Sequence, residues 1–135
     1  ETFFYIPIAY YSYLVHDDSA VRNNDSEKTV ENRINAVNDI YDYYKNKGLL
    51  IKYKQEINWI MFYHGFFLPA REIIHFDDYD KAYIKKLRDN YVFRTGGKYK
   101  DNGYYMSLSK KEKTTANALY NNMASVLNKI LKIKD

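Results

Sequence analysis

The sequence predicts a mainly α-helical protein, in which a short N-terminal strand element is followed by a bundle of about four helices. Two long segments, residues 26–47 and 109–135, repeat apolar side chains at steps of three and four, which is the period of one helix face. Residues 3–15 are instead rich in Phe, Tyr, Ile and Val, as strands are. Several amphipathic helices in one small chain bury their apolar stripes most simply as an antiparallel bundle.

The composition is that of a folded domain. With 135 residues the chain can form one modest core, and 46% hydrophobic with 28% charged residues indicates a globular protein. The absence of cysteine excludes disulfides and cysteine-ligated metals and fits a cytoplasmic location. No apolar run approaches the roughly 20 residues of a membrane span. A net charge of +4, spread along the chain, is mild for a nucleic-acid binder, so we expect no nucleic-acid partner.

The first two elements follow from local patterns. Residues 3–15 are expected to form one or two short strands broken at Pro7, and residues 16–25 carry turn chemistry. A helix over residues 26–47 is predicted to start at a cap formed by Asn24 or Asp25 and to stop at Gly48. Its apolar stripe consists of Val30, Ile34, Val37, Tyr41 and Tyr44.

The middle of the chain predicts two further helices. Residues 51–68 are apolar around most of a helix, which predicts burial, while Gly65 weakens this helix and Pro69 interrupts it. A short helical piece over residues 70–75 follows. Asp77 or Asp78 is then expected to cap a helix that runs to about residue 90.

The last third predicts a loop or hairpin and a clear final helix. Residues 93–107 contain the turn signals Gly96-Gly97 and Asn102-Gly103. Ser109 and Glu112 have the spacing of a capping box. The apolar stripe that follows consists of Ala116, Leu119, Met123, Val126, Ile130 and Ile133.

Motifs with possible chemistry in residues 60–100 have a structural reading that is simpler than the functional one. Asp78-Tyr79-Asp80 has the form of a metal-binding Asp-x-Asp, but a helix is expected to begin there, and acids at a helix N-terminus are favoured by the dipole alone. Glu72 and His75 have the spacing of a carboxylate-bridged iron site, which requires two copies of the motif. His64 is interpreted as a satisfied core histidine, and Gly96-Gly97-Lys98 as a turn without the spacing of a phosphate loop.

Residues 3–22, FFYIPIAYYSYLVHDDSAVR, resemble the segment that closes the catalytic domain of many bacterial family 2 glycosyltransferases. In that family an aromatic strand with a proline leads through a Tyr-x-Tyr strand to a polar turn that ends in serine. Pro7, Tyr11, Tyr13 and Ser19 occupy these places. The resemblance covers about the first third of the chain, including the helix that follows the turn.

The turn itself agrees with the family only in part. Relatives often carry a basic residue three positions before the serine, where this chain has His16. Relatives also often have glycine before the serine and arginine after the last tyrosine, where this chain has Asp18 and Leu14. The roles of these two positions do not carry over.

The resemblance implies that the chain is the C-terminal part of an enzyme with a GT-A fold. Residues 1–25 would be the end of the catalytic domain, comprising strands and a lid turn, and residues 26–135 a helical accessory domain. The metal-binding Asp-x-Asp and the acidic base would precede Glu1, so no catalytic residue and no cofactor is expected within this chain, while the full enzyme would use Mn²⁺ or Mg²⁺. The upstream catalytic domain would be its first partner.

The lid turn supplies the candidate site residues, His16, Asp17 and Ser19. In resembling enzymes this turn lies over the donor site, so His16 would touch the diphosphate or ligate the metal, or else be a hydrated turn histidine. Ser19 would bond a phosphate or cap the turn, of which capping is the simpler role.

Two functions are therefore expected, a leading one and an alternative. The first is the C-terminal part of a glycosyltransferase of surface polysaccharide synthesis, which moves a sugar from a nucleotide-sugar donor to a glycan or lipid-linked acceptor, in the cytoplasm or at the inner face of the membrane, and is inactive without its catalytic half. The alternative is a non-enzymatic helical interaction module, in which the stripe from Ala116 to Ile133 seats a partner helix or a second copy of the chain.

Overall fold

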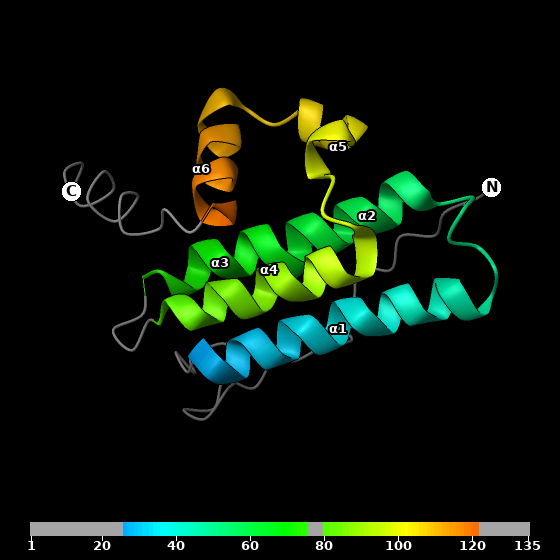
Figure 1. Ribbon diagram of the computed structural model, residues 1–135, viewed down its shortest axis with the longest axis horizontal. Helices are drawn as coiled ribbons and strands as arrows, with labels where there is room; N and C mark the ends of the chain where they lie inside the picture. The colour runs from blue at the N-terminus through cyan, green and yellow to red at the C-terminus, as the bar shows by residue number, and fades with distance from the viewer. Residues whose placement is uncertain (1–25, 76–79, 122–135) are drawn as a thin grey trace, which may run out of the picture.

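The structure is a computed structural model that describes residues 26–75 and 80–121. Its first layer is a bundle of three long helical rods that contact one another pairwise (Figure 1). The first is α1 (Ser26–Asn46), and the second is α2 (Lys54–Phe62), which continues through the π-helical segment η1 (Tyr63–Phe67) into α3 (Leu68–Ile73). The third is α4 (Lys81–Thr95). The rod formed by α2, η1 and α3 runs antiparallel to both α1 and α4, so α1 and α4 are parallel to each other.

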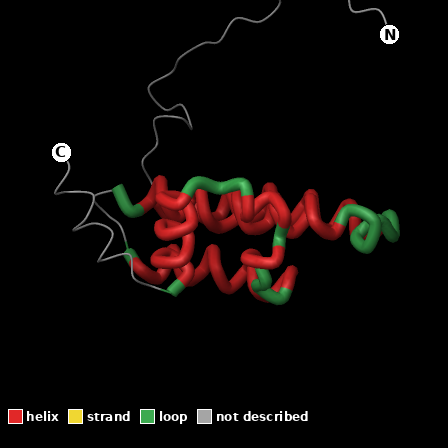
Figure 2. The backbone as a smooth tube through the Cα atoms, turned by 90° about the horizontal axis from the view of Figure 1, so that it is seen from above, coloured by secondary structure: helices red, strands yellow, loops and turns green. Residues whose placement is uncertain are grey.

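A smaller second layer covers the upper side of these rods in Figure 1. It consists of the 3-10 turn η2 (Tyr99–Asp101), the single-turn helix α5 (Gly103–Met106) and α6 (Lys110–Tyr120). The described backbone contains helices and loops and no strand (Figure 2). The prediction of a mainly α protein is confirmed, and the predicted strands of residues 3–15 lie outside the described residues.

The hairpin considered for residues 93–107 is not formed. Helix α4 continues to Thr95, and the rest of this stretch folds into the turn at Gly96-Gly97 followed by η2 and α5. The glycines do form a turn, since both have positive φ angles, 78° and 75°. The alternative to a strand pair is stabilised by Tyr99 and Tyr105, whose buried rings bring this segment onto the core.

Helix α1 agrees closely with its prediction. It ends at Asn46, and Gly48 follows in the left-handed conformation with φ 68°, as expected for a helix stop. Val30 and Val37 are buried, and the other stripe residues pack partly buried against the same core. The predicted capping residues, Asn24 and Asp25, lie outside the described residues.

Pro69 does not interrupt the second rod, because the helix widens around it. Proline lacks an N–H group, and its ring clashes with the carbonyl four residues earlier in a regular α-helix. Here the turn before Pro69 is π-helical, and Leu68 N–H donates to the carbonyl of Tyr63, five residues back. The helix therefore continues as α3 to Ile73. The predicted break at Pro69 is wrong for this reason.

The caps of α4 and α6 are both made by local side chains. Asp80, not Asp77 or Asp78, caps α4, since its carboxylate accepts from Ala82 N–H at 2.8 Å. The predicted capping box of α6 is confirmed: Ser109 Oγ accepts from Glu112 N–H at 3.2 Å, and the Glu112 carboxylate accepts from Ser109 N–H at 2.9 Å. The hydrogen bond from the Ser109 hydroxyl lowers the pKa of Glu112. The stripe residues after Asn121 lie outside the described residues.

Three polar pairs connect α1 to α4 in the same order along both helices. Lys86 Nζ lies 3.4 Å from a carboxylate oxygen of Glu31, the amides of Asn38 and Asn90 donate to each other at 3.2 Å, and Arg94 forms an ion pair with Asp42. The matching order is possible only for parallel helices. These pairs define the register, while their largely exposed ion pairs contribute little stability.

The core is mainly aromatic and joins the two layers. Phe62 is 1% exposed and lies at its centre. Its ring stacks on Tyr99 with centroids 4.6 Å apart and packs edge-on against Tyr91 at 5.6 Å. Rings of the second rod, α4 and η2 therefore meet at one point, which holds the turn after α4 in place.

Candidate functional site

The lid-turn candidates His16, Asp17 and Ser19 lie outside the described residues, and so does Asp78 of the Asp-x-Asp sequence. The second acid of that sequence, Asp80, has the structural role of capping α4. The structure therefore brings none of these residues into a described site.

The other candidate ligands are separated from one another. Glu72 forms an ion pair with Arg33 at 3.2 Å, which connects α3 to α1, and His75 is exposed. His64 was predicted to lie in the core, but it is exposed, with its ring edge-on to Tyr63 at 5.3 Å. It occupies the outer side of η1, whose buried residues are Gly65, Phe66 and Phe67. Within the described ranges, no group of three His, Cys, Asp or Glu side chains could hold a metal ion.

The polar side chains that the structure does bring together lie around the turn after α4, which is formed by Gly96 and Gly97. Thr95 stabilises the Gly96-Gly97 turn through two hydrogen bonds. The Thr95 hydroxyl donates to the Tyr91 carbonyl at 2.8 Å and accepts from Gly97 N–H at 3.3 Å. Gly97 also leaves no room for a side chain, because a Cβ atom there would lie 2.7 Å from Tyr120 Oη and 3.2 Å from Val92 Cγ2. The turn therefore has a fixed conformation, and it forms part of the wall of the two cavities described next.

A polar cavity of about 300 Å³ lies between this turn and the beginning of α2. Its lining combines two amines, one carboxylate, three amides and a hydroxyl: Lys54, Gln55, Asn58, Thr95, Lys98, Asp101 and Asn102. These side chains come from α2, from the end of α4 and from η2 with the residues flanking it. We call it the polar cavity.

Asn102 forms the fixed side of the polar cavity. Its side chain is 5% exposed, and its amide donates to the Gln55 carbonyl at 2.8 Å while its side-chain oxygen accepts from Tyr104 N–H at 2.9 Å. Gly103 N–H also donates to Gln55 Oε1 at 3.3 Å. These hydrogen bonds join the start of α5 to the first turn of α2, so they fix the positions of the two elements that line this side of the polar cavity.

Lys54 and Lys98 remain available in the polar cavity. Neither amine has an ion-pair or hydrogen-bond partner among the described residues, in contrast to Arg94, which is paired with Asp42 and lies 5.2 Å from the Tyr41 ring. Asp101 is the only acid in the lining, so the charge of the lining is +1 when the three groups are ionised. The cavity is therefore suited to a polar ligand that carries negative charge.

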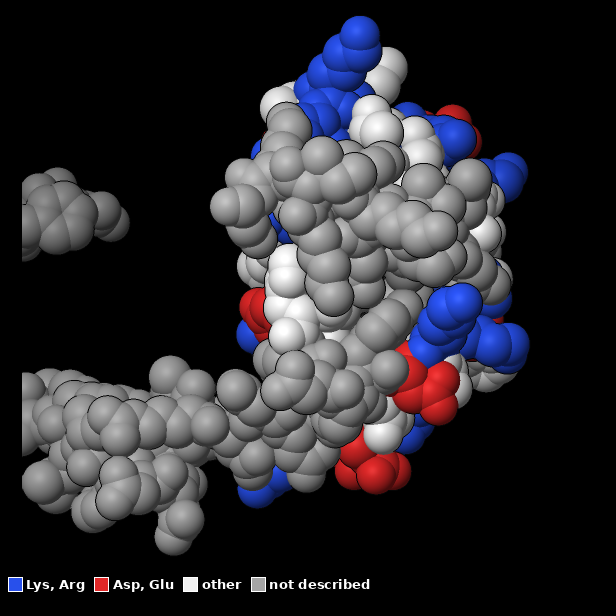
Figure 3. Space-filling view, turned by 90° about the vertical axis from the view of Figure 1, so that its left-hand side faces the viewer, with Lys and Arg blue, Asp and Glu red and all other residues white. Residues whose placement is uncertain are grey.

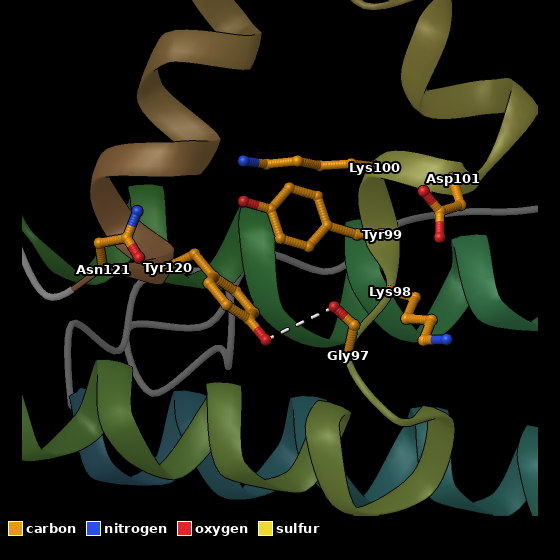
Figure 4. Close-up of a pocket in the computed structure, with 7 residues that line it drawn as sticks. All are labelled: Gly97, Lys98, Tyr99, Lys100, Asp101, Tyr120 and Asn121. Carbon is orange, nitrogen blue, oxygen red and sulfur yellow. Dashed lines mark hydrogen bonds between the residues drawn. The ribbon is translucent and has the colours of Figure 1, made fainter.

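A second cavity of about 320 Å³ lies on the other side of the same turn and shares Lys98 and Asp101 with the first (Figure 4). Lys100 extends across it above the Tyr99 ring, with Nζ 5.8 Å from the ring centroid. Tyr120 points from α6 toward the turn, and its hydroxyl donates to the Gly97 carbonyl at 3.5 Å. This side is the more aromatic of the two.

Two tyrosines beside the turn have altered acidity. Burial raises the pKa of Tyr99 well above its usual value, and burial likewise raises the pKa of Tyr91 to about 12. The Tyr99 hydroxyl donates to Asn117 Oδ1 at 2.7 Å, so it is anchored to α6. Both phenols stay protonated near neutral pH and act as structural groups.

A partly exposed aromatic stack lies along the second rod beyond the polar cavity. Trp59 stacks on Tyr63 with centroids 4.8 Å apart and on Tyr104 of α5 at 6.0 Å. Tyr104 is 45% exposed. The stack holds α5 over α2 through aromatic faces.

Basic and acidic side chains are both seen among the coloured atoms of Figure 3. Basic side chains gather at the top of this view, over α6, while lower down they lie beside acidic ones. This distribution agrees with the sequence-based expectation that the lysines are spread out. Among the described helices, none is both long and apolar enough to pass through a bilayer.

Sequence reasoning missed Lys54, Asn58 and Asn102. Only Asn102-Gly103 gave a signal, and it was the signal of a turn. These positions become a group only when α2 and the segment after α4 are packed together, because Lys54 and Lys98 are 44 residues apart in the chain.

Comparison with known proteins adds no relative: no family model, no curated protein and no solved structure matches this chain.

Proposed function

We propose that residues 26–135 are the helical accessory domain of a bacterial family 2 glycosyltransferase, with residues 1–25 as the end of its catalytic domain. The observation that carries this proposal is the resemblance of residues 3–22 to the closing segment of that catalytic domain.

In the proposed enzyme the chemistry occurs upstream of Glu1. An acidic base there deprotonates the acceptor hydroxyl, while Mn²⁺ or Mg²⁺ stabilises the leaving nucleoside diphosphate. The lid turn with His16, Asp17 and Ser19 covers the donor, and the helical domain holds the glycan or lipid-linked acceptor. The proposed location is the cytoplasm, either free or at the inner face of the membrane.

The gene tests the first part of this proposal. The codons that precede Glu1 should encode a nucleotide-binding half with an Asp-x-Asp sequence. An upstream sequence of any other fold class overturns the proposal.

The longer protein tests the role of the lid turn. We expect His16→Ala to lower the hydrolysis of a UDP-sugar in the presence of Mn²⁺. His64→Ala should leave it unchanged, because His64 is an exposed residue of η1 that is no part of the proposed lid turn. Equal turnover for the wild type and His16→Ala removes His16 from the proposed site.

A second function, a non-enzymatic interaction module, is favoured by a different observation. Among the described residues, Ile51 is 92% exposed, Phe93 85% and Met106 67%, although all three are large and apolar. They belong to separate elements, the segment before α2, α4 and α5, and a second copy of the chain that packs against α4 would cover Phe93. Sedimentation velocity distinguishes the cases: a dimer that Phe93→Ser dissociates supports the module, and a monomer across the micromolar range argues against it.

A further inference from the structure

We propose that the polar cavity binds a phosphate monoester, with Lys54 and Lys98 on the phosphate and Asp101 on a neighbouring hydroxyl group of the ligand. This proposal stands on the cavity and does not depend on the glycosyltransferase proposal. A phosphate and a hydroxyl group on adjacent carbons are the chemistry that matches two amines and one carboxylate in a single lining.

The amines of Lys54 and Lys98 supply the positive charge that a phosphate group requires. Lys54 is the first residue of α2, and Lys98 follows the two-glycine turn, so they reach the cavity from different elements. Both are exposed amines without ion-pair or hydrogen-bond partners in the described part of the chain, so both are free to turn toward an anion in the cavity. An anion with several oxygens can accept from both.

The beginning of α2 is the second argument. Its capping position is Tyr53, whose side chain makes no capping hydrogen bond. The first N–H groups of this nine-residue helix therefore lack a side-chain acceptor and add positive potential beside Lys54, which the carboxylate of Glu56 in the same turn offsets in part. The potential adds to the charge of the lysines and gives an anion a preferred end of the cavity.

The neutral lining supplies the third argument. Asn58 and Gln55 line the cavity with side-chain amides, which suit a ligand with both phosphate and hydroxyl groups, whereas the Thr95 hydroxyl is already bonded to the Tyr91 carbonyl and Gly97 N–H. Asp101 disfavours a bare anion by repulsion but accepts from a hydroxyl. The cavity of about 300 Å³ is at the lower end of small-molecule sites, so the ligand is small or is the end of a larger one.

The experiment is a titration of the full ¹⁵N-labelled chain with glycerol 3-phosphate, followed by amide shifts in two-dimensional NMR spectra. Inorganic phosphate and glycerol are titrated in parallel. We expect saturable shifts at Gly96, Gly97 and the first turn of α2, with the ester binding more tightly than inorganic phosphate and glycerol not binding.

Variants connect the binding to the named side chains. Lys54→Ala and Lys98→Ala should each weaken binding of glycerol 3-phosphate about tenfold, which is the effect of one charge-assisted hydrogen bond. Lys81→Ala is the matched control, because Lys81 is an exposed lysine at the opposite end of α4 from Thr95, and it should bind as the wild type does. Asp101→Asn should tighten inorganic phosphate and reduce the preference for the ester.

Three results overturn the proposal. They are the absence of saturable shifts, equal weakening by Lys81→Ala, and unchanged binding in both Lys54→Ala and Lys98→Ala. The spectra of the variants report their folding directly, so a loss of binding is scored only for a variant whose other amide signals stay in place.

Discussion

At the scale of single residues, Gly97 is a position where both the backbone conformation and the packing require glycine. Its φ of 75° favours glycine, and the space beside it is taken by Tyr120 and Val92. Gly48 has a similar φ of 68° but open space around it. The two glycines therefore separate the cost of the backbone angle from the cost of a steric clash.

We predict that Gly97→Ala lowers the free energy of unfolding more than Gly48→Ala does. The left-handed backbone alone costs roughly 1–2 kcal/mol for a residue with a Cβ atom. Gly97→Ala must in addition displace Tyr120 Oη from 2.7 Å, so a further cost of about 1 kcal/mol or more is expected. Urea unfolding of both variants measures the difference, and equal losses contradict the steric part.

The buried phenol of Tyr91 makes stability depend on alkaline pH. Its pKa is raised from 10.0 to about 12, so the folded protein keeps a proton that the unfolded chain loses. The stabilisation is fully present below pH 10 and is lost as pH rises toward 12. We predict a decline of at most about 1.4 kcal/mol per pH unit from this group. Urea unfolding between pH 9 and 12 should show a shallower decline for Tyr91→Phe, and an unchanged slope contradicts the assignment.

At the scale of elements, the second rod shows how one proline and one glycine shape a helix together. Pro69 is accommodated by the π-helical turn, and Gly65 within that turn allows α1 to approach closely. A Cβ atom at Gly65 would lie 3.0 Å from Val37 Cγ2. Because Val37 is β-branched and 3% exposed, it has little freedom to move away.

We predict that the effect of Gly65→Ala depends on residue 37. In the wild type the new methyl group meets Val37, and the expected loss of stability is about 1–2 kcal/mol. In a Val37→Ala background the contact is gone, and the higher helix propensity of alanine should add up to about 1 kcal/mol. A double-mutant cycle measures the coupling, and purely additive effects would show that the helices do not touch at this point.

At the scale of the whole molecule, the aromatic core makes the two layers one folding unit. The Phe62 ring contacts rings in the second rod, α4, η2 and α5, including Phe66, Phe67, Tyr91, Tyr99 and Tyr105. A change at this ring is therefore felt in both layers, including the turn that separates the two cavities.

We predict that Phe62→Ala destabilises the fold by about 3–5 kcal/mol, as expected for a large buried ring. Phe93→Ala is the matched control, since this ring is 85% exposed, and its effect should stay within about 0.5 kcal/mol. Unfolding is followed by far-UV circular dichroism and by fluorescence of Trp59. If the two signals separate in the wild type, the layers unfold independently and the single-unit interpretation is wrong.

The sequence by itself determined the local features of this protein. These features depend on residues within a few positions of one another, so the order of residues along the chain is enough to predict them. They are the stripe of α1, the stop at Gly48, the Gly96-Gly97 turn and the capping box of Ser109 and Glu112.

Only the tertiary structure decided what distant residues do together. The parallel pairing of α1 with α4, the exposure of His64 and the gathering of Lys54 with Lys98 depend on which helix faces meet. Helix faces of similar hydrophobicity can pair in several ways, and the choice is made by side-chain shape in the core. That shape is a property of packing rather than of spacing along the chain.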